Sequence, residues 1–154
     1  YSSVFKTRIN QVVYDLALFT TNQNTSVGHR IIFTENTLDM IKNVPFIGVG
    51  TGDFPTEYIK LNLVNSPAVK STVQPHNMYL YVQAQLGLLG LASFFWIFYV
   101  QFRIAATSKD LFVRNVGIAL PFLFLIIMLS DTYLLGHFTS NLFILFSSFL
   151  YSNR

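Results

Sequence analysis

The sequence contains no cysteine and little charge, since only 11% of its 154 residues are Asp, Glu, Lys or Arg, whereas soluble globular proteins carry about 25%. The absence of cysteine excludes a disulfide framework, a thiolate nucleophile and a cysteine-based metal site. Charge this sparse does not cover the surface of a soluble domain. Instead, 52% of the residues are hydrophobic, with 16 Phe and 8 Tyr, and a bilayer accepts such rings as lipid-facing surface and as interfacial anchors. The composition indicates part of a membrane protein and excludes a disordered chain.

The beginning of the sequence lacks the features of a natural start. The first residue is Tyr1 and not methionine. Residues 1–20 also lack the pattern of a signal peptide, which is a charged start followed by an apolar run and a small-residue cleavage site. We therefore expect the chain to be a fragment of a longer one.

Charges divide the sequence into two parts. Residues 1–77 carry most of them, with both signs nearly balanced, and residues 78–102 carry none. As a helix, residues 78–102 would extend roughly 37 Å and cross a hydrocarbon layer about 30 Å thick. The connection that follows is basic, with Arg103, Lys109 and Arg114. By the positive-inside rule it is cytoplasmic, so residues 1–77 face outward.

Residues 115–151 are apolar again, interrupted at residues 131–137 by polar and turn-forming residues. The interruption favours two helices, at about 115–130 and 138–151, over one very long helix. Together with residues 78–102 they make three transmembrane helices in residues 78–154. We therefore predict an all-α, polytopic transmembrane protein, a C-terminal fragment with a helical loop outside the membrane.

The outer segment, residues 1–77, has helical patterns of its own. Apolar residues recur at helical spacing from Phe5 to Leu16 with charged residues between them, which is typical of an amphipathic helix on a membrane or against a partner helix. A second helix is expected over residues 27–43, because Pro45 restricts the residue before it. A third helix begins at about Asp53, a residue suited to the N-cap.

Three glycines, Gly48, Gly50 and Gly52, could form a tight turn or a nest of backbone amides for phosphate. The turn is favoured, because the spacing is not GxGxxG and no apolar strand precedes it. The three histidines of the sequence are dispersed and lack the His-Glu-x-x-His pattern, so no zinc site is expected.

Arg30 and His76 are the remaining candidates for chemistry. Arg30 lies near the start of the second helix, where the helix dipole does not favour a cation; either a partner holds it there or it is a solvated loop residue. His76 lies between Pro75 and Asn77 at the membrane surface, and its residue type alone favours an interfacial polar position beside a helix cap.

The order of several short blocks is more specific than any one of them. The blocks TSVGHR at 25–30, NVPFIGVGTGDF at 43–54, PHNMYL at 75–80 and QLGLLGL at 85–91 follow one another with a helix after the first. In this order and spacing they resemble the O-antigen ligase family and its polymerase relatives. The resemblance covers about residues 8–99 as motifs and extends to the chain end as topology.

The resemblance implies a multi-pass glycosyltransferase of the bacterial inner membrane that moves a glycan from an undecaprenyl-diphosphate carrier to an acceptor. The leading expectation is O-antigen ligation to lipid A-core in lipopolysaccharide synthesis. The alternatives are an O-antigen polymerase, a protein O-oligosaccharyltransferase of the same superfamily and, in another class, a non-catalytic transporter or flippase for lipid-linked sugars. Residues 1–77 would be a periplasmic loop bearing the active site. The family implies membrane lipid as a partner, and no cofactor, metal or nucleic acid.

By position, the resemblance implies that Arg30 binds the carrier diphosphate and stabilises it as it leaves, and that His76 is the general base for the acceptor hydroxyl. A guanidinium offers phosphate a planar fork of donors, and an imidazole, with an unperturbed pKa of about 6.5, accepts a proton near neutral pH. Asn77 is a weaker candidate for substrate binding and is favoured as a helix cap. The family also uses an arginine from an earlier periplasmic segment. We therefore expect the N-terminal part of the same protein to be a partner, and the fragment alone to be inactive.

Overall fold

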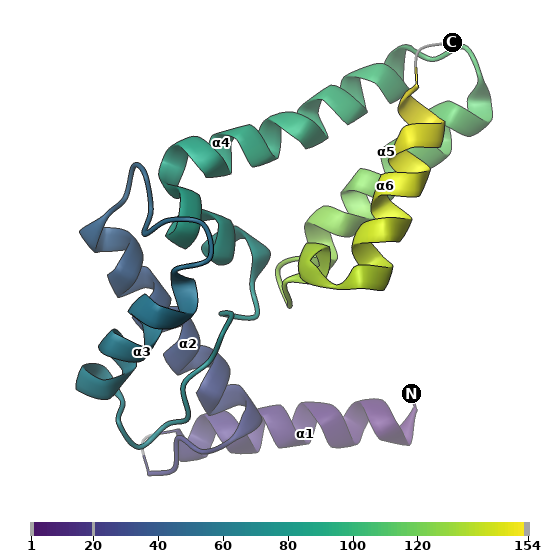
Figure 1. The fold of residues 1–154 in the computed structure, drawn as a ribbon. Helices are drawn as coiled ribbons and strands as arrows, with labels where there is room; N and C mark the ends of the chain where they lie inside the picture. The colour runs from purple at the N-terminus through teal and green to yellow at the C-terminus, as the bar shows by residue number, and fades with distance from the viewer. Residues whose placement is uncertain (1, 20, 153–154) are drawn as a thin grey trace.

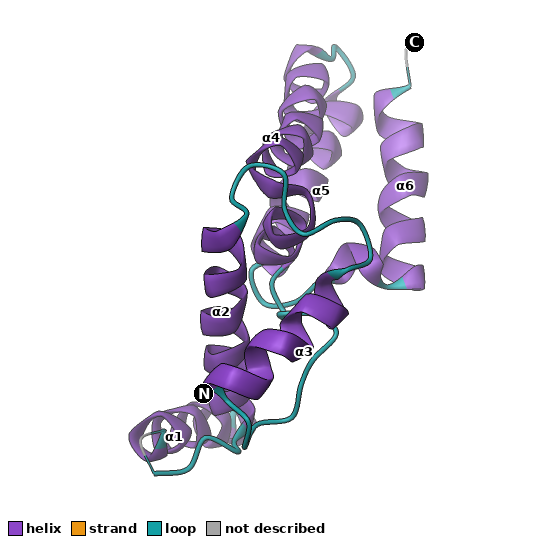
Figure 2. Ribbon diagram, turned by 60° about the vertical axis from the view of Figure 1, so that its left-hand side comes forward, coloured by secondary structure: helices purple, strands orange, loops and turns teal. Residues whose placement is uncertain are grey.

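A computed structural model describes residues 2–19 and 21–152, and the regular structure within them is entirely helical. This confirms the all-α prediction for the part of the chain that is described, and Figure 2 shows only helices and loops there. The elements in chain order are α1 (Ser3–Leu18), α2 (Ser26–Asn43), α3 (Phe54–Asn65), α4 (Met78–Thr107), α5 (Leu111–Ile127), the 3-10 turn η1 (Tyr133–Leu135) and α6 (His137–Tyr151). Figure 1 shows α1, α2 and α3 at one end, with α5 and α6 gathered beside the far part of α4.

Helix α4 differs from the straight rod predicted for residues 78–102. It extends to Thr107 and is broken at Gly87, where φ is 64° and ψ is −164°. Figure 1 shows its short first part and its long remainder running in different directions. Residues 88–107 alone would extend about 30 Å, the thickness of the hydrocarbon layer. Among the described residues, α4 is the one helix long and apolar enough to span a bilayer, so crossings by α5 and α6 stay a prediction.

The limits of the last two helices follow from local capping. Helix α5 begins at Leu111 and not at residue 115, because the Asp110 carboxylate accepts hydrogen bonds from the backbone N–H groups of Phe112 and Val113, at 2.8 and 3.3 Å. It ends at Ile127, three residues before the predicted end at 130. Helix α6, at His137–Tyr151, begins within one residue of its prediction.

Helix α5 runs antiparallel to α4 and packs against it, and α6 packs against both. The phenol of Tyr79, at the start of α4, donates to the carbonyl of Leu125 near the end of α5 at 2.5 Å. Farther along, Gln101 of α4 donates to the hydroxyl of Ser147 of α6 at 3.1 Å. The start of α4 and the end of α5 therefore meet at one end of the bundle.

The loop between α2 and α3 docks on the break in α4. A broken helix leaves backbone N–H and C=O groups without hydrogen-bond partners, and the loop supplies these partners. The amides of Val49 and Gly50 donate to the carbonyls of Ala84 and Gln85 at 2.8 and 3.0 Å, and the amide of Leu88 donates to the Pro45 carbonyl at 2.9 Å. The loop therefore completes the backbone hydrogen bonding of α4 around Gly87.

Glycine at two positions allows this approach. A Cβ on Gly48 would lie 2.3 Å from the carbonyl carbon of Gln85, and one on Gly87 would lie 2.2 Å from that of Phe46. Both glycines also have positive φ, at 70° and 64°. The glycine-rich segment is therefore a turn that packs on α4, as favoured, and its Val49 and Gly50 amides are not available for a phosphate nest.

Helices α2 and α3 enclose a core in which Phe54 and Tyr58 are fully buried. A polar network lies in this core, because the amide of Asn36 donates to the Tyr58 phenol at 3.2 Å and to the Asn62 side chain at 3.3 Å. Helix α3 starts at Phe54 as predicted, with Asp53 at the N-cap position, but the Asp53 side chain makes no capping hydrogen bond. The backbone carbonyl of Asp53 accepts from the Glu57 amide instead.

Helix α1 forms as predicted, but its apolar side does not pack on the rest of the described chain. Phe5 and Val13 are more than half exposed, and the one buried residue of α1 is Asp15, which accepts a hydrogen bond from Gln11 at 2.8 Å.

Candidate functional site

Arg30 is held at the start of α2 by a contact with a distant turn. The hydroxyl of Thr25 caps α2 by accepting from the Gly28 amide at 3.0 Å, which places Arg30 in the first turns of the helix. The Arg30 Nη1 donates to the carbonyl oxygen of Ser130 at 2.9 Å. Ser130 lies just after α5, so a partner for Arg30 does exist. This contact uses one of the five N–H donors of the guanidinium, and the residue is exposed.

His76 occupies the entry to α4 in an uncommon backbone conformation. Within the described residues it is the one non-glycine residue with positive φ, at 54°, a region to which few residues other than glycine are suited. Its Nδ1 lies 3.1 Å from Oδ1 of Asp131. Its ring stacks on Phe33 of α2, with centroids 6.0 Å apart and an interplanar angle of 22°. Two elements therefore orient the ring, one by a polar contact and the other by packing.

Asn77 is the N-cap of α4. Its side-chain oxygen accepts from the amides of Tyr79 and Leu80 at 3.0 and 3.1 Å, and its amide donates to the Leu129 carbonyl at 3.1 Å. The cap interpretation of Asn77 is therefore correct, and the same side chain also ties α4 to the segment after α5.

Four consecutive residues, 128–131, receive the hydrogen bonds from Arg30, from the His76 ring and from the side-chain amide of Asn77. Besides Leu129, Ser130 and Asp131, the carbonyl of Met128 accepts from the Met78 amide at 3.0 Å. We call residues 128–131 the acceptor turn, because each of them accepts a hydrogen bond, either from Arg30 or from one of residues 76–78. It places Arg30 and His76 on adjacent residues of one short segment.

The sequence patterns do not single out Asp131 as a site residue. They place it only in the polar interruption at residues 131–137. Its Oδ1 also accepts from the Thr132 amide at 2.8 Å. The available signal was topological: in an antiparallel helix pair, a carboxylate just after the second helix lies near a histidine just before the first. His29, the other histidine near the site, stacks on Phe33 at 5.8 Å and contacts the Asn24 side chain.

The contact between His76 and Asp131 determines what the imidazole can do. An ionised carboxylate only accepts hydrogen bonds, so Nδ1 of His76 carries the proton and donates it. In the neutral ring Nε2 then holds the lone pair and can accept a proton from a hydroxyl. A base oriented by a carboxylate in this way is the arrangement that activates hydroxyl nucleophiles in many hydrolases.

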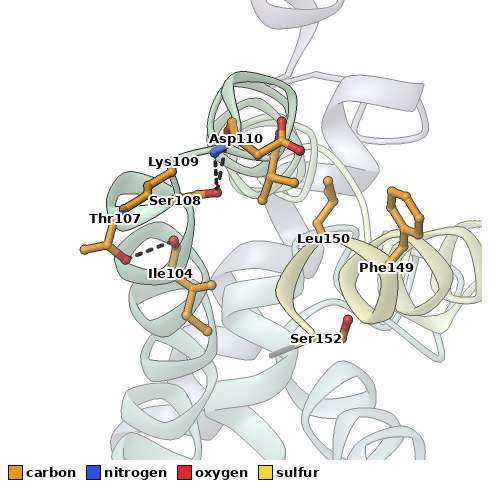
Figure 3. Close-up of a pocket in the computed structure, with 9 residues that line it drawn as sticks. Ile104, Thr107, Ser108, Lys109, Asp110, Phe149, Leu150 and Ser152 are labelled. Carbon is orange, nitrogen blue, oxygen red and sulfur yellow. Dashed lines mark hydrogen bonds between the residues drawn. The ribbon is translucent and has the colours of Figure 1, made fainter. Parts of the chain in front are cut away.

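Two cavities adjoin this region. One, of about 410 Å³, is lined by Asp131 and by residues of η1 and the start of α6. The other, of about 420 Å³, is lined by Arg30 and other residues of α2. A cavity of similar size, about 430 Å³, lies at the far end of the bundle between Lys109 and Leu150 and contains none of the candidate residues (Figure 3). In residues 2–19 and 21–152, no group of three or more His, Asp or Glu side chains could hold a metal ion.

Comparison with known proteins supplies the family. A family model described as O-antigen ligase matches residues 2–95, more than half of the chain, and this span includes Arg30, His76 and Asn77 but not Asp131. No curated protein matches the chain. The chain belongs to the O-antigen ligase family.

Proposed function

We propose that this chain contributes the active site of a membrane glycosyltransferase that moves a glycan from an undecaprenyl-diphosphate carrier to an acceptor hydroxyl, with O-antigen ligation to lipid A-core as its leading reaction. The observation that carries the proposal is the acceptor turn. It holds Arg30 at Ser130, 2.9 Å away, and His76 at Asp131, 3.1 Å away. A cation for a diphosphate and a base for a hydroxyl are thereby positioned by neighbouring residues.

The reaction follows from these positions. Nε2 of His76 takes the proton of the acceptor hydroxyl while the acceptor oxygen bonds to the anomeric carbon of the donor sugar. The bond from that carbon to the diphosphate oxygen breaks, and its electron pair leaves with the diphosphate. Arg30 stabilises the charge that develops on the phosphate oxygens, and Asp131 stabilises the imidazolium that forms at His76. Because diphosphate is a good leaving group, no general acid is required.

We further propose that residues 1–77 lie on the periplasmic side of the bacterial inner membrane and that α4, α5 and α6 cross it. The apolar length and composition of α4 support this arrangement. Helices α5 and α6 have 17 and 15 residues and would extend roughly 26 and 22 Å. Spans this short are accommodated by local thinning of the bilayer or by flanking side chains that reach to the interface. His76 and Arg30 would then lie where a lipid-borne diphosphate meets the membrane surface.

The decisive experiment replaces His76 in the full-length protein by asparagine. Asn tolerates a positive φ better than most residues, so His76→Asn removes the base with little backbone strain. We expect glycan transfer to be lost and the carrier-linked donor to accumulate on the periplasmic side. Arg8→Lys, an exposed substitution on α1, serves as the control and should transfer normally. Transfer by His76→Asn at the wild-type rate would contradict the general-base role, and loss of donor on the periplasmic side would favour a transporter.

A further inference from the structure

Two separate cavities lie at the site and share no lining residue, one lined by a member of the acceptor turn and the other by residues of α2. One is lined by Asp131, which contacts His76, and we call it the Asp131 cavity. The other is lined by Arg30, which contacts Ser130, and we call it the Arg30 cavity. A transferase with two substrates needs two such places next to its reacting groups.

The charges of the two cavities differ. The Arg30 cavity contains a permanent cation, with Glu35 farther along the same helix. The Asp131 cavity contains a carboxylate and no Lys or Arg. Only the Arg30 cavity offers phosphate oxygens the planar fork of donors of a guanidinium, so the anionic donor belongs at Arg30. The Asp131 cavity suits an uncharged, hydroxyl-bearing sugar unit of a larger ligand.

The lining of the Asp131 cavity combines an exposed aromatic ring with polar groups. Phe138, at the start of α6, is 92% exposed. Beside it in the lining are Tyr133, His137 and Gln74, which offer hydrogen-bond donors and acceptors. The Gln74 oxygen accepts from the Thr132 hydroxyl, so its amide N–H groups remain for a ligand among the described contacts. An aromatic surface with a few convergent polar groups fits a sugar ring, which has apolar C–H faces and a hydroxyl edge.

We propose that the Asp131 cavity is the subsite for the acceptor glycan, with Phe138 as its stacking surface and His137 as a polar contact. This inference rests on the proposed function and deepens it, since it assigns one cavity to each substrate. Asp131 lines the subsite and also orients His76. A sugar bound there lies beside the carboxylate that contacts Nδ1 of His76. The leaving diphosphate lies with Arg30, which contacts Ser130, the residue before Asp131 in the acceptor turn.

The test is steady-state transfer by the purified full-length protein, with deacylated lipopolysaccharide core oligosaccharide as the acceptor probe. Phe138→Ala should raise the KM for this oligosaccharide about tenfold, the loss of roughly 1.4 kcal/mol of binding. The KM for the undecaprenyl-diphosphate donor should not change. Phe112→Ala is the matched control, since Phe112 is also an exposed aromatic residue, 58% exposed, at the other end of the bundle. It should change neither KM.

Equilibrium binding separates this inference from the proposed function. His76→Asn protein should bind the core oligosaccharide in calorimetry although it transfers nothing, and Phe138→Ala added to it should weaken that binding about tenfold. Unchanged binding and KM in Phe138→Ala would overturn the subsite. A raised donor KM with an unchanged acceptor KM would also overturn it. Transfer by His76→Asn would contradict only the general-base role of His76. The binding measurements would still test the acceptor subsite.

Discussion

His76 and Asp131 are 55 positions apart in the sequence and are joined by a contact of 3.1 Å between Nδ1 and Oδ1. The contact links the entry of α4 to the segment that follows α5. It leaves Nε2 of His76 for a substrate, and it makes Asp131 a positioning residue for the base we propose. Asp131 lies outside the residues that match the family model, so its role is inferred from geometry.

Asp131→Asn should therefore impair turnover more than binding. The amide keeps the size of the side chain but no longer stabilises an imidazolium, and it can turn a donor toward Nδ1. We expect kcat for glycan transfer to fall about 10²-fold, with a much smaller change in the donor KM. Asp131→Glu, which restores the carboxylate, should recover part of the activity. Equal activity of Asp131→Asn and wild type would show that His76 does not depend on this carboxylate.

Arg30→Lys keeps the charge at the Arg30 cavity and removes the planar fork. A lysine binds phosphate as a point charge and cannot make two parallel hydrogen bonds to it. We expect transfer to fall about 10²-fold, as when one donor to a developing negative charge is removed. The matched variant Arg8→Lys should retain full activity in the same assay. A normal rate for Arg30→Lys would remove Arg30 from the site.

Local sequence signals predicted which segments are helical and identified the cap at Asn77, because those features depend on near neighbours. The restriction imposed by Pro45 and the capping by Asn77 both act within a few residues. The contacts of the acceptor turn could not be predicted in this way, since they join residues far apart in the chain. Only the antiparallel packing of α4 and α5 brings Asp131 to His76.

Two other features depended on tertiary packing. Gly87 lies in an uncharged run that reads as a continuous helix, yet the docked loop supplies hydrogen bonds that make a break there possible. Leu38 of α2 is apolar and yet 41% exposed. The buried side instead contains Asn36, because α3 provides polar partners for it.

Gly48→Ala tests the docking of the loop on α4. Gly48 and Gly52 both have positive φ, at 70° and 88°, so alanine at either position costs about 1–2 kcal/mol of backbone strain. A Cβ at Gly48 would also lie 2.3 Å from the Gln85 backbone, whereas a Cβ at Gly52 would meet nothing within 4 Å. Thermal unfolding in detergent should therefore show a clearly larger loss of Tm for Gly48→Ala than for Gly52→Ala. Equal losses would mean that strain alone, and not close approach, requires glycine at position 48.

Ionisation of Tyr58 at alkaline pH should lower the stability of the outer segment. Burial raises the pKa of the Tyr58 phenol above its ordinary value of 10.0, and the hydrogen bond from Asn36 opposes this in part. The folded state therefore holds the phenolic proton more tightly than the unfolded state, and the free energy of unfolding falls as the pH rises past about 10. Tyr58→Phe removes this titration and costs about 1 kcal/mol for the lost hydrogen bond. Thermal unfolding at pH 8 and pH 10.5 should show a smaller drop in Tm for Tyr58→Phe than for wild type, and an equal drop would place the alkaline sensitivity on other groups.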